Sequence, residues 1–188
     1  MIEYKPIIRE NPKVICAGGG ISAWYNIPTI LKDIILRFNL KTDSALEFGV
    51  GCGYSTTALA NYFKKVVGVD TFKSNIRDLD LNKPSNIGVV QEAIKEFTNI
   101  ELVESLFEDY IKNDNLENFD IIHVDILHEY QPTYMCGNWS LLHSNCVIFH
   151  DTISFTAVMR AVDDLSIKHN FEFYNYPYDN GLGILVKK

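Results

Sequence analysis

The stretch LEFGVGCG, residues 46–53, decides the fold of this 188-residue chain. Its three glycines alternate with other residues directly after residues 44–48, a short apolar run typical of a buried strand. Residues 55–63 follow with the apolar spacing of a helix. Glycine tolerates positive φ and lets the backbone approach a ligand closely. The stretch therefore predicts a strand, a ligand-binding glycine loop and a helix in succession.

The spacing of the glycines separates two kinds of nucleotide site. A dinucleotide site that supports a pyrophosphate reads GxGxxG, whereas this loop reads GxGxG, with Glu47 before the first glycine. A carboxylate there would repel a pyrophosphate and suits a ligand that bears an amino group and a sulfonium. The alternative is a glycine turn with no ligand. Cys52 is interpreted as filling a variable position of the loop.

A second acid supports the ligand-binding interpretation. The run VVGVD, residues 66–70, is a strand that ends at Asp70, about twenty residues after the glycine loop. An acidic side chain at the end of the second strand can accept hydrogen bonds from both ribose hydroxyls. A ligand that contains a nucleoside explains both features.

Strand-like and helix-like segments alternate along the rest of the chain, which indicates a parallel sheet covered by helices on both faces. We predict a doubly wound, seven-stranded, Rossmann-like α/β sheet whose last strand is antiparallel, because an Asn-Gly turn joins the final two strands. Residues 1–188 are predicted to form one domain, with residues 1–43 as an N-terminal helical extension and residues 44–188 as the core. The predicted strands are residues 44–48, 66–69, 100–103, 119–126, 146–149, 171–176 and 182–186. The predicted helices after the extension are residues 55–63, 73–81, 89–97, 106–112, 130–142 and 156–169.

Composition limits the classes of partner. The formal net charge of −7 and the scattered Lys and Arg residues argue against nucleic acid as a partner. No apolar run approaches the length of a membrane span, so a cytoplasmic enzyme with no membrane partner is expected, and a homo-oligomer is compatible with the sequence. The cysteines form no CxxC pair, which favours reduced thiols over a zinc site or a disulfide framework. They are Cys16, Cys52, Cys136 and Cys146.

Four segments together resemble a known family. LEFGVGCGYST, VVGVD, FDIIHVDILHEY and VIFHDT resemble class I S-adenosylmethionine (SAM)-dependent methyltransferases. The resemblance runs from about residue 45 to the end of the chain. It is greatest to a small-molecule group with a D-x-x-H-x-Y segment, which includes relatives of cephalosporin hydroxylase and of macrolide-sugar O-methyltransferases.

The resemblance implies a set of residues that bind SAM. Glu47 and the three loop glycines would line its methionine end, Asp70 would hold the ribose, and Ser105 would border the adenine. Asp125 would contact the methyl donor from the neighbouring strand. This chain has Glu104-Ser105 where the family often has Asp-Ser or Asp-Ala. The implied cofactor-binding residues are Glu47, Gly49, Gly51, Gly53, Asp70, Ser105 and Asp125.

Asp125 and Asp151 follow adjacent predicted strands and could converge beside the methyl donor. Two carboxylates offer the hard oxygen ligands that Mg²⁺ or Mn²⁺ prefers, and such a cation could lower the pKa of an acceptor hydroxyl. Related metal sites have Asn or Asp where this chain has Thr152. In the alternative interpretation, Asp151 caps the following helix and Asp125 binds loop amides.

His128 is the candidate general base, because an imidazole with an ordinary pKa accepts a proton at neutral pH. The alternative is a histidine that braces its loop. His150 is a weaker candidate for the base, and the alternative is that it orients Asp151. His123, inside an apolar strand, is expected to be a hydrogen-bonded core residue.

Trp24 and Tyr25 follow three glycines and would form either a lid over the site or an apolar anchor for the N-terminal helix.

The overall prediction is SAM-dependent O-methylation of a small molecule such as a sugar or secondary metabolite. Two alternatives remain, namely a hydroxylase-like enzyme on the same fold and a SAM-binding module without turnover.

Overall fold

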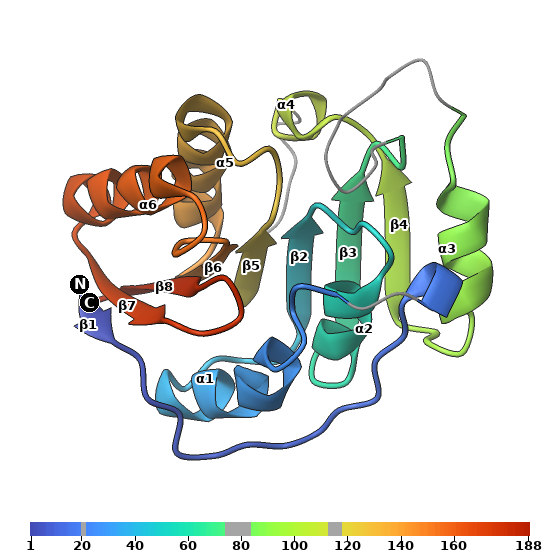
Figure 1. Cartoon of the computed structure of the whole chain (residues 1–188), viewed down its shortest axis with the longest axis horizontal. Coiled ribbons are helices and arrows are strands. Elements are labelled where there is room, and N and C mark those ends of the chain that lie inside the picture. The colour runs from blue at the N-terminus through green and yellow to red at the C-terminus, as the bar shows by residue number, and fades with distance from the viewer. Residues whose placement is uncertain (20–21, 74–83, 113–117) are drawn as a thin grey trace.

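The computed structural model describes residues 1–19, 22–73, 84–112 and 118–188, and these form one sheet with helices against both faces (Figure 1). The strands are β1 (Ile2–Glu3), β2 (Ser44–Phe48), β3 (Lys65–Asp70), β4 (Ile100–Glu104), β5 (Ile121–Val124), β6 (Cys146–His150), β7 (Phe171–Tyr176) and β8 (Leu182–Lys187). The α-helices are α1 (Leu31–Arg37), α2 (Tyr54–Ala60), α3 (Ile87–Ile94), α4 (Phe107–Tyr110), α5 (Tyr130–His143) and α6 (Thr156–His169). Two short 3-10 turns precede them, η1 (Ala17–Gly19) and η2 (Ile27–Ile30).

The strand order is β1-β7-β8-β6-β5-β2-β3-β4, and β8 runs antiparallel to both β6 and β7, while the other neighbouring strands pair in parallel. The predicted doubly wound sheet with an antiparallel last strand is therefore confirmed. The seven predicted strands are β2 to β8, and the two-residue β1 adds an eighth strand beside β7. The chain reverses its direction of winding between β2 and β5, which is where ligands bind in open α/β sheets.

Two apolar cores lie on opposite faces of the sheet. Side chains of successive strand residues point to opposite faces. Ala45 therefore packs in the core between the sheet and helices α1 and α2, while Leu46 packs in the core between the sheet and helices α5 and α6. Figure 1 shows α1 and α2 below the sheet and α4, α5 and α6 above it. Burial on both faces explains why the central strands read as continuous apolar runs.

The N-terminal extension is helical, as predicted, and is fixed by Asp33 of α1. This buried carboxylate accepts hydrogen bonds from the Tyr4 hydroxyl at 2.5 Å and from the amides of Ile7 and Ile8 at 3.0 and 2.9 Å. It also pairs with Arg37 at 3.0 Å. The segment before α1 is thereby held against the helix.

Two further findings concern the helices. The helix predicted for residues 73–81 lies, apart from its first residue, outside the described residues. Among the helices that the structure does describe, none combines the length and apolarity of a membrane span.

Candidate active site

The candidate site lies at the carboxyl ends of the central parallel strands. The glycine loop follows β2 and Asp70 ends β3. Asp125 follows β5, and Asp151 follows β6. Because these strands are parallel neighbours, their ends meet at one edge of the sheet (Figure 1).

The glycine loop has the backbone conformation that its sequence predicts. Gly49, Gly51 and Gly53 have φ values of +93°, +55° and +86°. A Cβ atom on Gly49 would lie 1.7 Å from the carbonyl oxygen of Asp125, whereas one on Gly51 would meet no atom of the described residues within 4 Å. Gly49 is therefore required for the packing of the loop against β5, and Gly51 faces open space.

Asp70 is oriented by the loop it faces. One carboxylate oxygen accepts the Gly51 amide at 2.9 Å, and the other accepts the Phe72 amide at 2.7 Å. Each carboxylate oxygen can accept a further hydrogen bond. The structure thus places the predicted ribose acid directly beside the glycine loop.

Glu47 lies beneath the loop, with no exposed surface. One of its oxygens contacts Nδ1 of His123 at 2.8 Å, and the other accepts a hydrogen bond from the Thr56 hydroxyl of α2. The carboxylate therefore links β2, β5 and α2 around the base of the loop. In this conformation both oxygens are engaged inside the protein, and its contact with a methyl donor stays a prediction.

Ser105 lies near Asp70. Its amide donates to the backbone carbonyl of Asp70 at 2.9 Å, and its hydroxyl donates to the carbonyl of Leu106 at 2.8 Å. Glu104, the residue before it, is exposed at the end of β4 and pairs in register with Asp70. Ser105 is thus positioned at the same edge as the glycine loop, and its role at an adenine ring stays a prediction.

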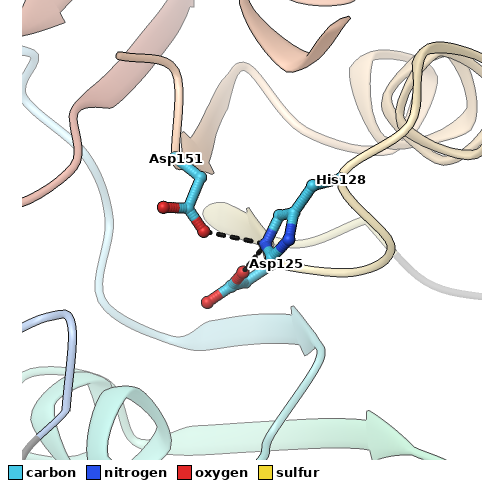
Figure 2. Close-up of side chains that lie close together, drawn as sticks. All are labelled: Asp125, His128 and Asp151. Carbon is cyan, nitrogen blue, oxygen red and sulfur yellow. Dashed lines mark hydrogen bonds and ion pairs between the residues drawn. The ribbon is translucent and has the colours of Figure 1, made fainter. Parts of the chain in front are cut away.

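Asp125, His128 and Asp151 come together on the other side of the loop (Figure 2). Nε2 of His128 lies 2.8 Å from an oxygen of Asp151 and 3.4 Å from an oxygen of Asp125. One ligand atom from each residue lies within 4.8 Å of the others, the spacing of a metal-binding group. The imidazole of His128 stacks on Phe155, with ring centroids 4.2 Å apart, which fixes its orientation.

His150 forms a second contact to both carboxylates. Its Nδ1 atom lies 3.3 Å from an oxygen of Asp125 and 3.3 Å from an oxygen of Asp151. Its Nε2 atom lies 3.1 Å from the backbone carbonyl of Asp179. His150 is almost entirely buried, so it holds the two acids from the protein side, as the alternative interpretation of His150 predicts for Asp151.

The four side chains set each other's ionisation. Burial opposes charge on Asp125 and Asp151, but contacts with His128 and His150 outweigh it and hold the pKa of both carboxyls below the ordinary range. Hydrogen bonds to Asp125 and Asp151 raise the pKa of His128 to about 9. Burial lowers the pKa of His150, yet the same two carboxylates raise it to about 10. The carboxylates are therefore anionic at neutral pH.

The alternative interpretation of Asp151 as a helix cap is wrong. The N-cap position of α6 is occupied by Phe155, whose side chain makes no capping hydrogen bond. Asp151 instead has φ +63°, a conformation that costs energy in non-glycine residues and occurs often at functional sites. The Thr152 hydroxyl donates to the side-chain oxygen of Asn175 at 2.7 Å and is not a member of the group of Asp125, His128 and Asp151.

The aromatic and cysteine predictions have different outcomes. Trp24 is 1% exposed and packs against His123 with ring centroids 4.4 Å apart, so it is an apolar anchor and not a lid.

The prediction that the cysteines are all reduced thiols is wrong for one pair, since Cys16 and Cys52 form a disulfide. The spacing of these two cysteines in the sequence gives no signal of this pairing, because they come from separate segments.

The donor set fits a divalent cation. Oδ1 of Asp151 is buried and finds no hydrogen-bond partner among the described residues, which leaves a charged oxygen free to ligate. The two carboxylates are the hard oxygen ligands that Mg²⁺ or Mn²⁺ prefers. Sequence reasoning found Asp125 and Asp151 but missed His128 as a third ligand candidate and Phe155 as its support. The spacing of Asp125 to His128 was the available signal, and nothing in the sequence marked Phe155.

One comparison with known proteins shows the family. Residues 46–153 match the family model described as a methyltransferase domain. A search of curated proteins finds no match.

Solved structures share the fold. A Staphylococcus aureus protein assigned as a caffeoyl-CoA O-methyltransferase has a TM-score of 0.65 at 16% identity, with 86% of this chain and 83% of that chain covered. The precorrin-6y C5,15-methyltransferase of Geobacter metallireducens has a TM-score of 0.64 at 11% identity, with 93% of this chain and 94% of that chain covered. The Podospora anserina methyltransferase PaMTH1, solved with S-adenosylhomocysteine (SAH), has a TM-score of 0.56 at 15% identity, with 78% of this chain and 72% of that chain covered.

Proposed function

This chain belongs to the methyltransferase-domain family and is a class I SAM-dependent methyltransferase, and from this premise we propose that it methylates a hydroxyl group of a small molecule. Similar folds act on different atoms, as the O- and C5,15-methyltransferases among the similar structures show in their names. The choice of acceptor therefore depends on the site and not on the fold.

The observation that carries the proposal is the contact between the two parts of the site. Gly49 of the glycine loop packs directly on the backbone of Asp125, so a donor on the loop lies next to the cluster of Asp125, His128 and Asp151. Methyl transfer is an in-line displacement that needs donor and acceptor held in contact. A hydroxyl acceptor also needs its proton removed or its oxygen polarised, and ionisable side chains, or a cation that they hold, can provide this.

The residues on the donor side bind and orient. We assign the loop glycines to the methionine end of SAM, Asp70 to the ribose hydroxyls and Ser105 to the edge of the adenine. Glu47 supports the loop from below through His123 and Thr56. Contacts that hold the base of the loop in place lower the entropy lost when the donor binds.

On the acceptor side, Asp125 and Asp151 would supply carboxylate oxygens to Mg²⁺ or Mn²⁺, and His128 would become a third ligand on losing the proton that its pairing now holds. A bound cation would supply Lewis acidity to an acceptor hydroxyl. Asp125 and Asp151 contribute negative charge, His150 fixes them from behind, and Phe155 holds the imidazole of His128 in place.

In a second candidate mechanism, His128 acts as the base without a metal. The observation that favours it is that 33% of the His128 side chain is exposed, so an acceptor can reach it. In its present pairing with two carboxylates it holds its proton at neutral pH, because its pKa is about 9. Base catalysis by His128 would therefore require that the acceptor or another group first relieve this pairing.

The test begins with the purified full chain, SAM and a panel of sugars, phenols and amines. The proposal expects SAH to accumulate only with hydroxyl acceptors, to stop with EDTA and to return with Mg²⁺ or Mn²⁺. Activity that persists in EDTA but vanishes in His128→Ala would replace the metal mechanism with base catalysis. SAM binding without SAH from any acceptor would favour the binding module, and an oxidised product without SAH would favour a hydroxylase-like enzyme.

A further inference from the structure

Two cysteines from distant parts of the sequence meet at the glycine loop. Cys52 lies between Gly51 and Gly53, and Cys16 lies in the segment before η1, 36 residues away. Their Cα atoms are 5.0 Å apart, within the range that a disulfide spans, and the two side chains are joined as a disulfide. Both residues are partly exposed, so small reagents in solution can reach them.

The segment that carries Cys16 lies along the loop and the helix behind it. We call residues Lys13–Ala17 the strap. The amide of Ala17 donates to the carbonyl of Cys52 at 2.8 Å, and the amide of Ile15 donates to the Thr57 hydroxyl of α2 at 3.0 Å. Asn61, just beyond α2, exchanges two hydrogen bonds with the backbone of Lys13. The strap is therefore aligned with the loop even without the covalent bond.

The loop residue beside Cys52 connects to the ribose acid. Gly51 donates its amide to Asp70, so a bond at Cys52 restrains the short loop from which Asp70 takes its orientation. A loop that must shift to admit or release a ligand moves less freely when it is covalently joined to a second segment, because the tether removes conformations that both segments would otherwise sample.

The other two cysteines are unsuited to oxidation. Cys136 and Cys146 have no exposed surface. Burial raises the pKa of the Cys146 thiol to about 12 and also raises that of Cys136. Since the thiolate is the reactive form, oxidation of the folded chain is directed to the pair at the loop.

We propose that Cys16 and Cys52 are an oxidative modification site whose co-reactant is a small disulfide such as oxidised glutathione, and that forming the bond slows exchange of the methyl donor. One thiolate attacks the small disulfide, forms a mixed disulfide and releases one small thiol. The second thiolate displaces the other small thiol as the Cys16–Cys52 bond forms. The pair loses two electrons and two protons, and the small disulfide gains both.

This inference rests on the proposed donor role of the glycine loop. The full chain is equilibrated with oxidised glutathione or with dithiothreitol, and peptide mass analysis shows the state of the Cys16–Cys52 linkage. Stopped-flow binding then gives the rates of SAM association and SAH release. We expect both rates to fall by about tenfold on oxidation and to recover on reduction, because the tether restricts the loop.

Cys16→Ser is the control, because it removes the bond without altering the loop. Because Cys52 alone can still form a mixed disulfide with glutathione, peptide mass analysis first confirms that Cys52 is unmodified, and this variant should then exchange SAM at the reduced wild-type rate under both conditions. Equal rates for oxidised and reduced wild type, a linkage that does not form, or oxidative slowing that persists in Cys16→Ser would each overturn the inference while leaving the proposed function intact. Reduced wild type that does not bind SAM would instead refute the donor role of the loop.

Discussion

The edge of the sheet that carries the site has two halves that meet where Gly49 touches Asp125. On one side of this contact, the glycine loop and Asp70 present mainly backbone groups, and Asp70 is oriented by two backbone amides. On the other side, Asp125, His128, His150 and Asp151 form a cluster of two carboxylates and two imidazoles within ion-pair distance. The first half is shaped by conformation and the second by charge.

This difference suggests a division of labour. The half formed by the glycine loop and backbone amides suits a ligand that is the same in every turnover, because the shape of the loop tolerates little change in that ligand. A half built from ionisable side chains can activate an acceptor, since it supplies the charge that proton removal requires. Substitutions in the two halves should therefore affect different quantities, donor affinity in one and turnover in the other.

The largest effect is expected where the halves touch. Gly49→Ala should weaken SAM binding by about 4 kcal/mol, from strain at positive φ plus overlap with the backbone of Asp125. Gly18→Ala is the matched control, because Gly18 also has positive φ (+82°) but lies outside the proposed site, and its new Cβ would meet no described atom within 4 Å. Only a cost of about 1 kcal/mol in stability from its φ is expected, with SAM affinity almost unchanged. Calorimetric titration with SAM measures both. Similar losses for the two variants would show that the contact with Asp125 does not matter.

Asp125→Asn should separate the halves. We expect turnover to fall by about 100- to 1000-fold, which corresponds to roughly 3–4 kcal/mol, with the dissociation constant of SAM almost unchanged. Glu129→Gln, which neutralises an exposed acid in the same loop, should leave both quantities as they are. Steady-state kinetics and SAM titration of each variant provide the comparison. A loss of SAM affinity as large as the loss of turnover would place Asp125 in the donor half.

Asp33 supports the scaffold beneath both halves and should affect neither function. Its buried carboxylate has a pKa below the ordinary value, since hydrogen bonds from Tyr4 and two amides, with the charge of Arg37, outweigh burial. Its contribution to stability is present above the unfolded pKa of about 3.9 and is lost as pH falls through the lower folded pKa.

Asp33→Ala should accordingly lower the free energy of unfolding by about 3 kcal/mol at neutral pH, and the loss should shrink in acid. Urea unfolding at several pH values measures this, and SAM affinity and turnover of the folded variant should match wild type. A stability loss that is the same at every pH would show that the charge of Asp33 is not what stabilises the fold.

The smallest effect is expected at the ribose acid. Asp70→Ala should weaken SAM binding by about 2 kcal/mol through the loss of charge-assisted hydrogen bonds, while turnover at saturating SAM changes little. Titration with SAM and thermal unfolding of the same preparation distinguish lost contacts from lost structure. A stable variant with wild-type affinity would remove Asp70 from the donor half.

The sequence predicted the elements that depend on local pattern. Residues 44–48 and 156–169 were assigned to a strand and a helix with the bounds that the structure has, because burial on known faces produces a readable periodicity. The glycine loop was equally legible, since positive φ at alternate positions selects glycine. The two-residue β1 was missed, because a strand of that length has no periodicity and exists only through its pairing with β7.

Only the tertiary structure decided which residues from distant parts of the chain contact one another. The glycine spacing, the acid at the end of β3 and the alternation of strands and helices follow from each residue's own conformational preference and burial, so the sequence alone determined them. The pairing of Glu47 with His123, the contact of His128 with Asp151 and the bond between Cys16 and Cys52 each join residues from separate elements. Their geometry depends on how the strands and the N-terminal segment pack together, and that packing sets the ionisation of the cluster and the chemistry of the thiols.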